Sequence, residues 1–164
     1  MMNRNSFGFT LIEMLIVITS LVLLLIAGSN LLFGSLLGSS KSEVQKEVRQ
    51  NGEYALKVME ETIKNAVKLE FCDLTTVTVK NQNNQDITFK VLNDGSNIPR
   101  VASNSSYLTS NKVKVKNLSF TCEENPGLPP KIKISFTVEQ VQTTDRPEKK
   151  ASMQFSTVVS MRNF

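Results

Sequence analysis

The chain begins with a long apolar run and then changes character. From Phe9 to Leu37 nearly every residue is Leu, Ile, Val, Met, Phe or a small residue, whereas the chain after Lys41 is polar and mixed in charge. As a helix this run would be about 43 Å long, which is enough to cross a lipid bilayer. The pattern therefore predicts a transmembrane helix over residues 9–38 that is apolar on all sides.

A second helical pattern follows the apolar run, and no proline interrupts it. Its apolar residues recur at helical steps, with Lys, Glu, Gln and Arg between them. These apolar residues are Val44, Val48, Leu56, Met59, Ile63 and Val67. We therefore expect one continuous helix over residues 9–69, about 90 Å long. Its second half carries a single apolar stripe, and such a stripe needs a partner surface.

The rest of the chain alternates apolar and polar residues with period two, which is typical of strands with one buried face. The alternating residues are Val77 and Val79; Ile87, Phe89 and Val91; Val113 and Val115; Leu118 and Phe120; Ile132, Ile134, Phe136 and Val138; and Met153, Phe155 and Val159. Turn-forming clusters separate these runs at 81–85, 93–97, 125–130 and 143–150. The alternation shifts between Val115 and Leu118, which predicts a β-bulge near Lys116–Asn117. We expect a mostly antiparallel meander packed on the second half of the helix, and hence an α+β fold.

Composition narrows the classes of function. A chain of 164 residues has room for one modest domain beside the apolar run. It has no histidine, which excludes nucleophile systems and zinc sites that depend on histidine. The basic residues behind its net charge of +4 are scattered and lack interleaved aromatic residues, so nucleic-acid binding is not indicated. No phosphate-binding loop and no nucleophile with a readable base is present, so we expect no enzyme, cofactor, metal or small-molecule substrate.

The two cysteines, Cys72 and Cys122, both lie beyond the apolar run. If this part of the chain lies outside the cytoplasm, the pair can form a disulfide. Two buried free thiols are the alternative, because sequence spacing alone does not decide between them. A disulfide would join the helix exit to a central strand and stabilise the fold by about 3–4 kcal/mol.

One carboxylate, Glu13, stands near the start of the apolar run. An ionised carboxylate at the centre of a bilayer costs about 2.5–3.5 kcal/mol on insertion scales, and less near an end. A carboxylate that is present despite this free-energy cost indicates a functional role. It needs a nearby positive charge to compensate it. A cut between Gly8 and Phe9 would create an α-amino group at Phe9. That cation could neutralise Glu13 within one helix or across to a neighbouring helix.

The sequence GFTLIE at residues 8–13, followed by the apolar run, resembles the class III signal of type IV pilins and of the related type II secretion pseudopilins. The resemblance implies that a prepilin peptidase cuts after Gly8 and methylates the new N-terminal residue, Phe9. It also implies that Glu13 pairs with the Phe9 amine of an adjacent subunit in a filament core. The motif residues that fit the family pattern around the cut are Thr10, Leu11 and Ile12.

The resemblance also implies an organisation and a location. Residues 1–8 would be a prepilin leader, residues 9–38 a transmembrane and filament-core helix, and residues 39–164 the helix continuation plus an extracytoplasmic sheet domain. Arg4 favours a cytoplasmic N-terminus. We therefore expect a single-pass protein of the bacterial inner membrane that later enters a pilus or pseudopilus. Its implied partners are the prepilin peptidase and other pilin subunits.

Two further features refine the expected subtype. Asn30 stands where the helix of major pilins often carries a proline, which favours a minor pilin. Residues 49–68, 98–120 and 155–164 resemble the J-type minor pseudopilins and their pilus counterparts. Such a subunit would help to initiate or cap the fibre rather than form its shaft.

Two other interpretations of the apolar run remain open. The run can be an ordinary secretory signal peptide that is cut near Ala27, Gly28 and Ser29. It can also be an uncleaved anchor for an extracytoplasmic binding module, such as an adhesin. The length of the run, the carboxylate of Glu13 and the helix that continues from it weigh against the signal peptide. The mature N-terminus distinguishes the three.

Overall fold

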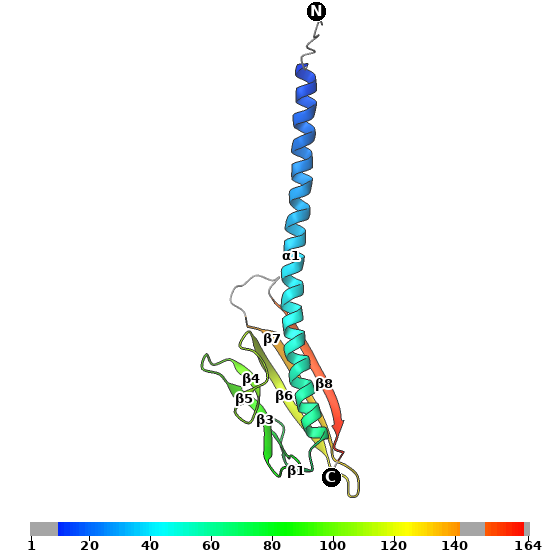
Figure 1. The fold of residues 1–164 in the computed structure, drawn as a ribbon, viewed down its shortest axis with the longest axis vertical. Coiled ribbons are helices and arrows are strands. Elements are labelled where there is room, and N and C mark those ends of the chain that lie inside the picture. The colour runs from blue at the N-terminus through cyan, green and yellow to red at the C-terminus, as the bar shows by residue number, and fades with distance from the viewer. Residues whose placement is uncertain (1–9, 142–149, 163–164) are drawn as a thin grey trace, which may run out of the picture. The chain divides into compact units, whose positions relative to one another are not determined.

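The computed structural model describes residues 10–141 and 150–162, which form one helix and eight strands. The contacts divide the chain between Ser39 and Ser40 into two compact units. The helix α1 (Leu11–Lys64) contributes to both units, and all the strands belong to the second (Figure 1). In that unit the helix packs on antiparallel sheets, so the predicted α+β class is confirmed.

The first unit is the apolar part of α1. Every side chain described between Leu11 and Ser39 is exposed, and Leu11 and Leu31 keep 85% and 77% of their surface. By length and composition this helix can cross a membrane. Because apolar surface on this scale is unfavourable in water, the segment needs lipid or other apolar helices around it.

In the second unit one face of α1 is buried. Its fully buried residues are Val48, Gly52, Ala55, Met59 and Ile63. Three large residues of the predicted stripe are therefore confirmed as core, whereas Val44 and Leu56 are only half-buried and Val67 is exposed. Gly52 and Ala55 were not predicted, because the apolar pattern registers only large side chains. Small residues at these two positions let the helix backbone lie close to the sheet.

The helix ends at Lys64, so the predicted end at residue 69 is wrong. The N–H of Val67 donates to the carbonyl of Lys80 at 2.8 Å, and the strand β1 (Lys68–Cys72) follows directly. The N–H of Arg162 donates to the carbonyl of Lys64 at 3.0 Å and satisfies one carbonyl of the last turn. Pairing with a neighbouring strand therefore overrides the helical periodicity of this segment.

The first sheet has five antiparallel strands in the order β1-β2-β3-β4-β5. The remaining bounds are β2 (Val77–Lys80), β3 (Asp86–Asn93), β4 (Pro99–Ser103) and β5 (Ser106–Tyr107). The turns predicted at 81–85 and 93–97 are confirmed as the β2–β3 and β3–β4 connections. Asn81 and Asp94 each accept two backbone N–H groups of their own turn, at 2.9 to 3.0 Å, and so fix the two turns.

The second sheet has three antiparallel strands in the order β6-β7-β8. The bounds are β6 (Val113–Glu123), β7 (Lys131–Gln140) and β8 (Ser152–Ser160). The predicted bulge is confirmed, because the β6–β7 register shifts between Lys116 and Ser119, and Asn117 has a φ of 53°. The turn at 125–130 is confirmed as well, whereas the turn predicted at 143–150 lies outside the described residues except for Lys150. The antiparallel meander order is confirmed within each sheet, whereas the expectation of one sheet is wrong because the strands form two.

A disulfide joins Cys72, at the end of β1, to Cys122 in β6, with their Cα atoms 6.5 Å apart. Beside it the N–H of Phe120 donates to the carbonyl of Leu74 at 2.8 Å. Because β1 and β6 are edge strands, the bond links the edges of the two sheets. The predicted connection to a central strand is therefore wrong.

The second unit has one core, shared by the helix stripe and both sheets. Its largest fully buried side chains include Phe89, Phe120, Phe136, Met59 and Ile63. The rings of Phe136 and Phe155 stack, with centroids 5.5 Å apart. A Cβ atom added at Gly52 would overlap the ring of Phe155. The glycine therefore permits the contact between α1 and β8.

Candidate functional site

Glu13 lies in the first turn of α1 and is exposed. Its N–H donates to the carbonyl of Thr10 at 3.1 Å and to Thr10 Oγ1 at 3.3 Å. Thr10 therefore caps the helix, and the Thr-x-x-Glu spacing is that of a capping box. A carboxylate at this end also interacts favourably with the helix dipole. The motif thus gives the helix a defined start, whatever further role its carboxylate has.

The predicted cleavage residues, Gly8 and Phe9, lie outside the described residues. The pairing of the Phe9 amine with Glu13 consequently stays a prediction. The other two motif residues, Leu11 and Ile12, are 85% and 64% exposed. They are part of the apolar surface that runs along the first unit.

Three hydroxyl groups within this apolar surface are satisfied by the helix itself, those of Thr19, Ser20 and Ser29. Thr19 donates to the carbonyl of Leu15 at 3.0 Å, and Ser29 donates to that of Leu25 at 2.8 Å. Ser20 bonds in the same way to a carbonyl one turn earlier. Such back-bonding removes most of the cost of placing a hydroxyl in lipid. These residues are therefore compatible with an apolar environment.

The most polar side chains of the apolar run, those of Glu13 and Asn30, lack this compensation, as does the smaller hydroxyl of Ser35. Neither the carboxylate of Glu13 nor the amide of Asn30 makes a hydrogen bond with any residue that the structure describes. In lipid an unpartnered polar group is costly, so a further polar or charged group that pairs with each of them would be favourable there. The candidate site is therefore the uncovered helix surface together with these two polar groups.

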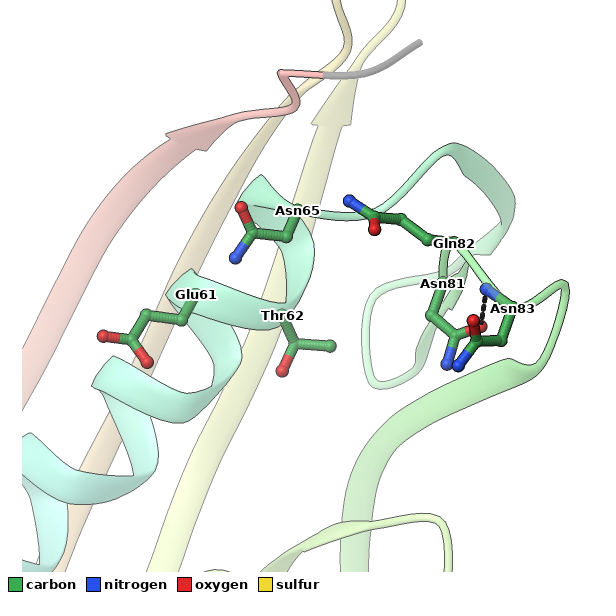
Figure 2. A pocket seen from close by; sticks show the side chains of 6 residues that line it. All are labelled: Glu61, Thr62, Asn65, Asn81, Gln82 and Asn83. Atoms are coloured by element: carbon green, nitrogen blue, oxygen red, sulfur yellow. Dashed lines mark hydrogen bonds between the residues drawn. The ribbon is translucent and has the colours of Figure 1, made fainter.

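The second unit carries a polar pocket of about 440 Å³ between the end of α1 and the β2–β3 turn (Figure 2). Its lining residues are Glu61, Thr62, Asn65, Asn81, Gln82 and Asn83. Asn81 is committed to the turn, because its Oδ1 accepts the N–H of Asn83 at 2.9 Å. The single ionisable group of the lining, Glu61, is 64% exposed and lies 3.9 Å from Lys57. The pocket thus pairs no nucleophile with a base.

Arg100 holds together the β3–β4 turn and the segment after β5. Its Nε donates to the carbonyl of Thr109 at 2.7 Å, and its guanidinium lies 4.2 Å from the centroid of the Tyr107 ring. Asp94 Oδ2 lies 3.6 Å from the same guanidinium. The N–H of Ile98 in first place, and then that of Ser96 and the guanidinium, lower the pKa of Asp94. The sequence did not indicate this cluster, because its members belong to separate strands and turns.

Two glutamates on the sheets are also held ionised by lysines. Glu139 lies 2.9 Å from Lys116, whose hydrogen bond lowers the pKa of that carboxyl group. Glu70 lies between Lys68 and Lys80, at 3.2 Å from each, and their hydrogen bonds lower its pKa in that order. Across residues 10–141 and 150–162, no group of three or more Cys, Asp or Glu is placed to hold a metal ion.

Comparison with known proteins identifies neither a family nor a function for the chain. No family model matches the chain, and it matches neither a curated protein nor a solved structure.

Proposed function

We propose that the chain is a minor type IV pilin or type II pseudopilin, a structural subunit that helps to initiate or cap a filament. One observation carries the proposal: the sequence GFTLIE places Glu13 at the head of an apolar helix whose described side chains are exposed on every side. A helix of this kind suits both storage in a membrane and packing among like helices. Its role is assembly rather than catalysis.

The proposed mechanism starts in the inner membrane. A prepilin peptidase cuts after Gly8, and the new amine at Phe9 is methylated. In the filament core that amine pairs with Glu13 of a neighbouring subunit. Because an unpaired charge is expensive in a low-dielectric core, the pair favours one axial register over the alternatives. The amide of Asn30 adds an interhelical hydrogen bond farther along the same surface.

The mature N-terminus tests the first step. The chain is expressed with and without a prepilin peptidase, and its N-terminal peptide is identified by mass spectrometry. We expect a peptide that begins at Phe9, carries one additional methyl group and depends on the peptidase. A start after Ser29 would mean a secreted protein, and an intact Met1 or Met2 a plain membrane anchor. Either result would replace the proposal by the alternative, an extracytoplasmic binding module that does not assemble into a filament.

The charge of Glu13 tests the second step. Glu13→Gln keeps the size of the side chain and removes its charge, so this variant should reach the membrane and be cut but fail to join the filament. Ser20→Ala is the matched control, because it removes a polar group of the same run that is already satisfied by the helix. The control should assemble normally. Normal incorporation of Glu13→Gln would contradict the proposed pairing.

A further inference from the structure

The second sheet ends at β8, and the hydrogen-bond register shows which way its backbone groups point. Gln140 donates to the carbonyl of Ala151 at 3.0 Å, and Met161 donates to that of Pro130 at 3.2 Å. Both bonds continue the β7–β8 register. Bonded pairs alternate along antiparallel strands, so the odd-numbered residues bond to β7 and the even-numbered residues point away. The outward residues are Ser152, Gln154, Ser156, Val158 and Ser160.

These outward groups are open to solvent. The side chains of the same residues are exposed, and Val158 keeps 62% of its surface. Each residue carries one N–H and one C=O. No backbone hydrogen bond joins any of these groups to another residue in the described part of the chain. In Figure 1, β8 is the outer strand of its sheet. The edge thus presents a row of unused donors and acceptors.

The other three sheet edges are closed to strand addition. The edge of β6 is bulged between Lys116 and Ser119, donates a hydrogen bond to the carbonyl of Leu74 and carries the disulfide. The strand β1 is short, contains the charged Lys68 and Glu70, and has its own register shift. The strand β5 has only two residues. Bulges, charges and short strands are the usual means of keeping an edge from pairing with another chain.

The edge of β8 has none of these protections. The sequence SMQFSTVVS contains no charged residue, proline or glycine, and its register with β7 is regular over its whole length. Positive charges lie just beyond both ends, at the exposed residues Lys150 and Arg162. The edge is therefore neutral in the middle and cationic at its two ends, over about 40 Å at the rise of a strand.

We propose that β8 is a docking edge for an extended, uncharged segment of another protein, bounded by acidic residues. The segment adds to the sheet as an antiparallel strand. Its backbone uses the outward groups of β8, and its terminal carboxylates lie near Lys150 and Arg162. This proposal does not depend on the filament role, since it concerns only the second unit.

The same charges disfavour a second copy of this chain as the occupant. If two β8 strands paired antiparallel about Ser156, Lys150 of one copy would lie opposite Arg162 of the other at both ends. Like charges placed opposite each other destabilise strand pairing. An acidic end on the incoming segment replaces this repulsion by attraction, which gives the edge a preference for a foreign partner.

A designed peptide tests the edge. The probe has an uncharged Thr/Val/Ser centre, an aspartate at each end and a fluorescent label, and the full chain is held in detergent micelles. We expect saturable binding by fluorescence anisotropy, together with slower amide hydrogen exchange over residues 152–160. A peptide with lysine at both ends should bind at least about tenfold more weakly, which corresponds to about 1.4 kcal/mol. Absence of saturable binding up to about 1 mM would overturn the proposal.

Substitutions at Ser156 test whether the peptide binds along the edge of β8. Ser156→Pro removes an outward N–H and leaves the bonds to β7 intact, because the pair formed with Ser135 is not a bonded one. Ser156→Lys adds a charge and keeps the full backbone, so it serves if the proline variant does not fold. Each should weaken binding at least about tenfold. Gln82→Lys, which adds the same charge in the exposed β2–β3 turn, should bind like the parent chain.

Three further results would contradict the proposal. Unchanged binding by both Ser156 variants would place the peptide elsewhere, and equal weakening by Gln82→Lys would show that the loss is not specific to the edge of β8. Dimerisation of the chain that is abolished by Ser156→Lys would show that a second copy occupies the edge. None of these results bears on the N-terminal peptide found by mass spectrometry, so the two proposals fail independently.

Discussion

The two halves of α1 share one backbone conformation but depend on different surroundings. Between Leu11 and Ser39 the described apolar residues are spread around the helix and all are exposed. Between Ser40 and Lys64 the buried residues form a single stripe against the sheets. Tertiary packing supplies most of the stability of such a half-buried helix, whereas an all-round apolar helix is stable in lipid. The angular distribution of apolar residues, rather than their number, therefore distinguishes a packing helix from a membrane helix.

Removal of the disulfide should destabilise the second unit and leave the apolar half of α1 unchanged. We expect this difference in stability to be the largest. The double change Cys72→Ser and Cys122→Ser releases a loop with a sequence separation of 50. We expect the free energy of unfolding of the second unit to fall by about 4 kcal/mol on the loop-closure relation. Urea unfolding followed by tyrosine fluorescence measures this, since the chain has two tyrosines and no tryptophan. Helical signal from the apolar half in detergent should not change. An unfolding midpoint that is insensitive to reductant in the parent chain would contradict the expectation.

The same kind of truncation should act differently in the two halves. Met59 is fully buried, so Met59→Ala should lower the free energy of unfolding of the second unit by about 3 kcal/mol. Leu24 is 73% exposed, so Leu24→Ala should leave that quantity within about 0.5 kcal/mol of the parent value. Urea titrations of both variants in the same detergent compare them directly. Equal losses would show that the helix unfolds as one cooperative unit.

Replacing one glycine in each half of α1 by alanine should change stability in opposite directions. Gly28→Ala meets nothing within 4 Å, so it should stabilise the isolated helical segment by up to about 1 kcal/mol. Gly52→Ala places a methyl group where the ring of Phe155 lies. Overpacking costs about 1–3 kcal/mol and outweighs the helix preference, so the second unit should lose about 1 kcal/mol. Calorimetry of the two variants tests the opposite signs. Stabilisation by both changes would mean that Phe155 moves aside freely.

Lowering the pH should also reduce the free energy of unfolding of the second unit. This reduction should be smaller than those caused by the disulfide, core and glycine changes. The pKa values of Asp94, Glu70 and Glu139 are lowered from ordinary values of 3.8 for Asp and 4.5 for Glu. A lowered carboxyl pKa stabilises the folded state above the unfolded pKa, and that stability is lost as the pH falls through the folded pKa. We therefore expect a constant urea midpoint from pH 7 to about 5 and a decline below that. Asp94→Asn should reduce the slope of the decline. An unchanged slope would show that its contacts do not contribute.

Sequence periodicity predicted those parts of the fold that depend on local pattern. The apolar helix, three large residues of its stripe, the turns at 81–85 and 93–97, and the bulge at Lys116–Asn117 all follow from residue order alone. The helix end at Lys64 does not, because it is decided by a strand partner that lies far along the chain. Gly52 belongs to the core because the ring of Phe155 covers it. The two residues are far apart in the chain, so periodicity along the sequence does not predict this contact.

The candidate site was predictable to a similar extent. Glu13 stands out in the sequence because a charge in an apolar run is costly, and Thr10 is recognisable from its spacing to that glutamate. The open edge of β8 was not predictable. Whether a strand is an edge depends on the order of strands in the sheet, and the alternation along Ser152–Ser160 would look the same in a central strand.

The bond between the N–H of Arg162 and the carbonyl of Lys64, together with the ring of Phe155 over Gly52, has a consequence for biosynthesis. The second half of α1 leaves the ribosome early, but its end and its glycine are covered by β8 and the residue pair that follows it. The part of the helix around Gly52 and its end at Lys64 thus lack these contacts while the intervening strands are being made. The second unit consequently cannot complete its core before β8 has been made, and a chain interrupted before β8 would present part of an apolar helix face to cellular quality control.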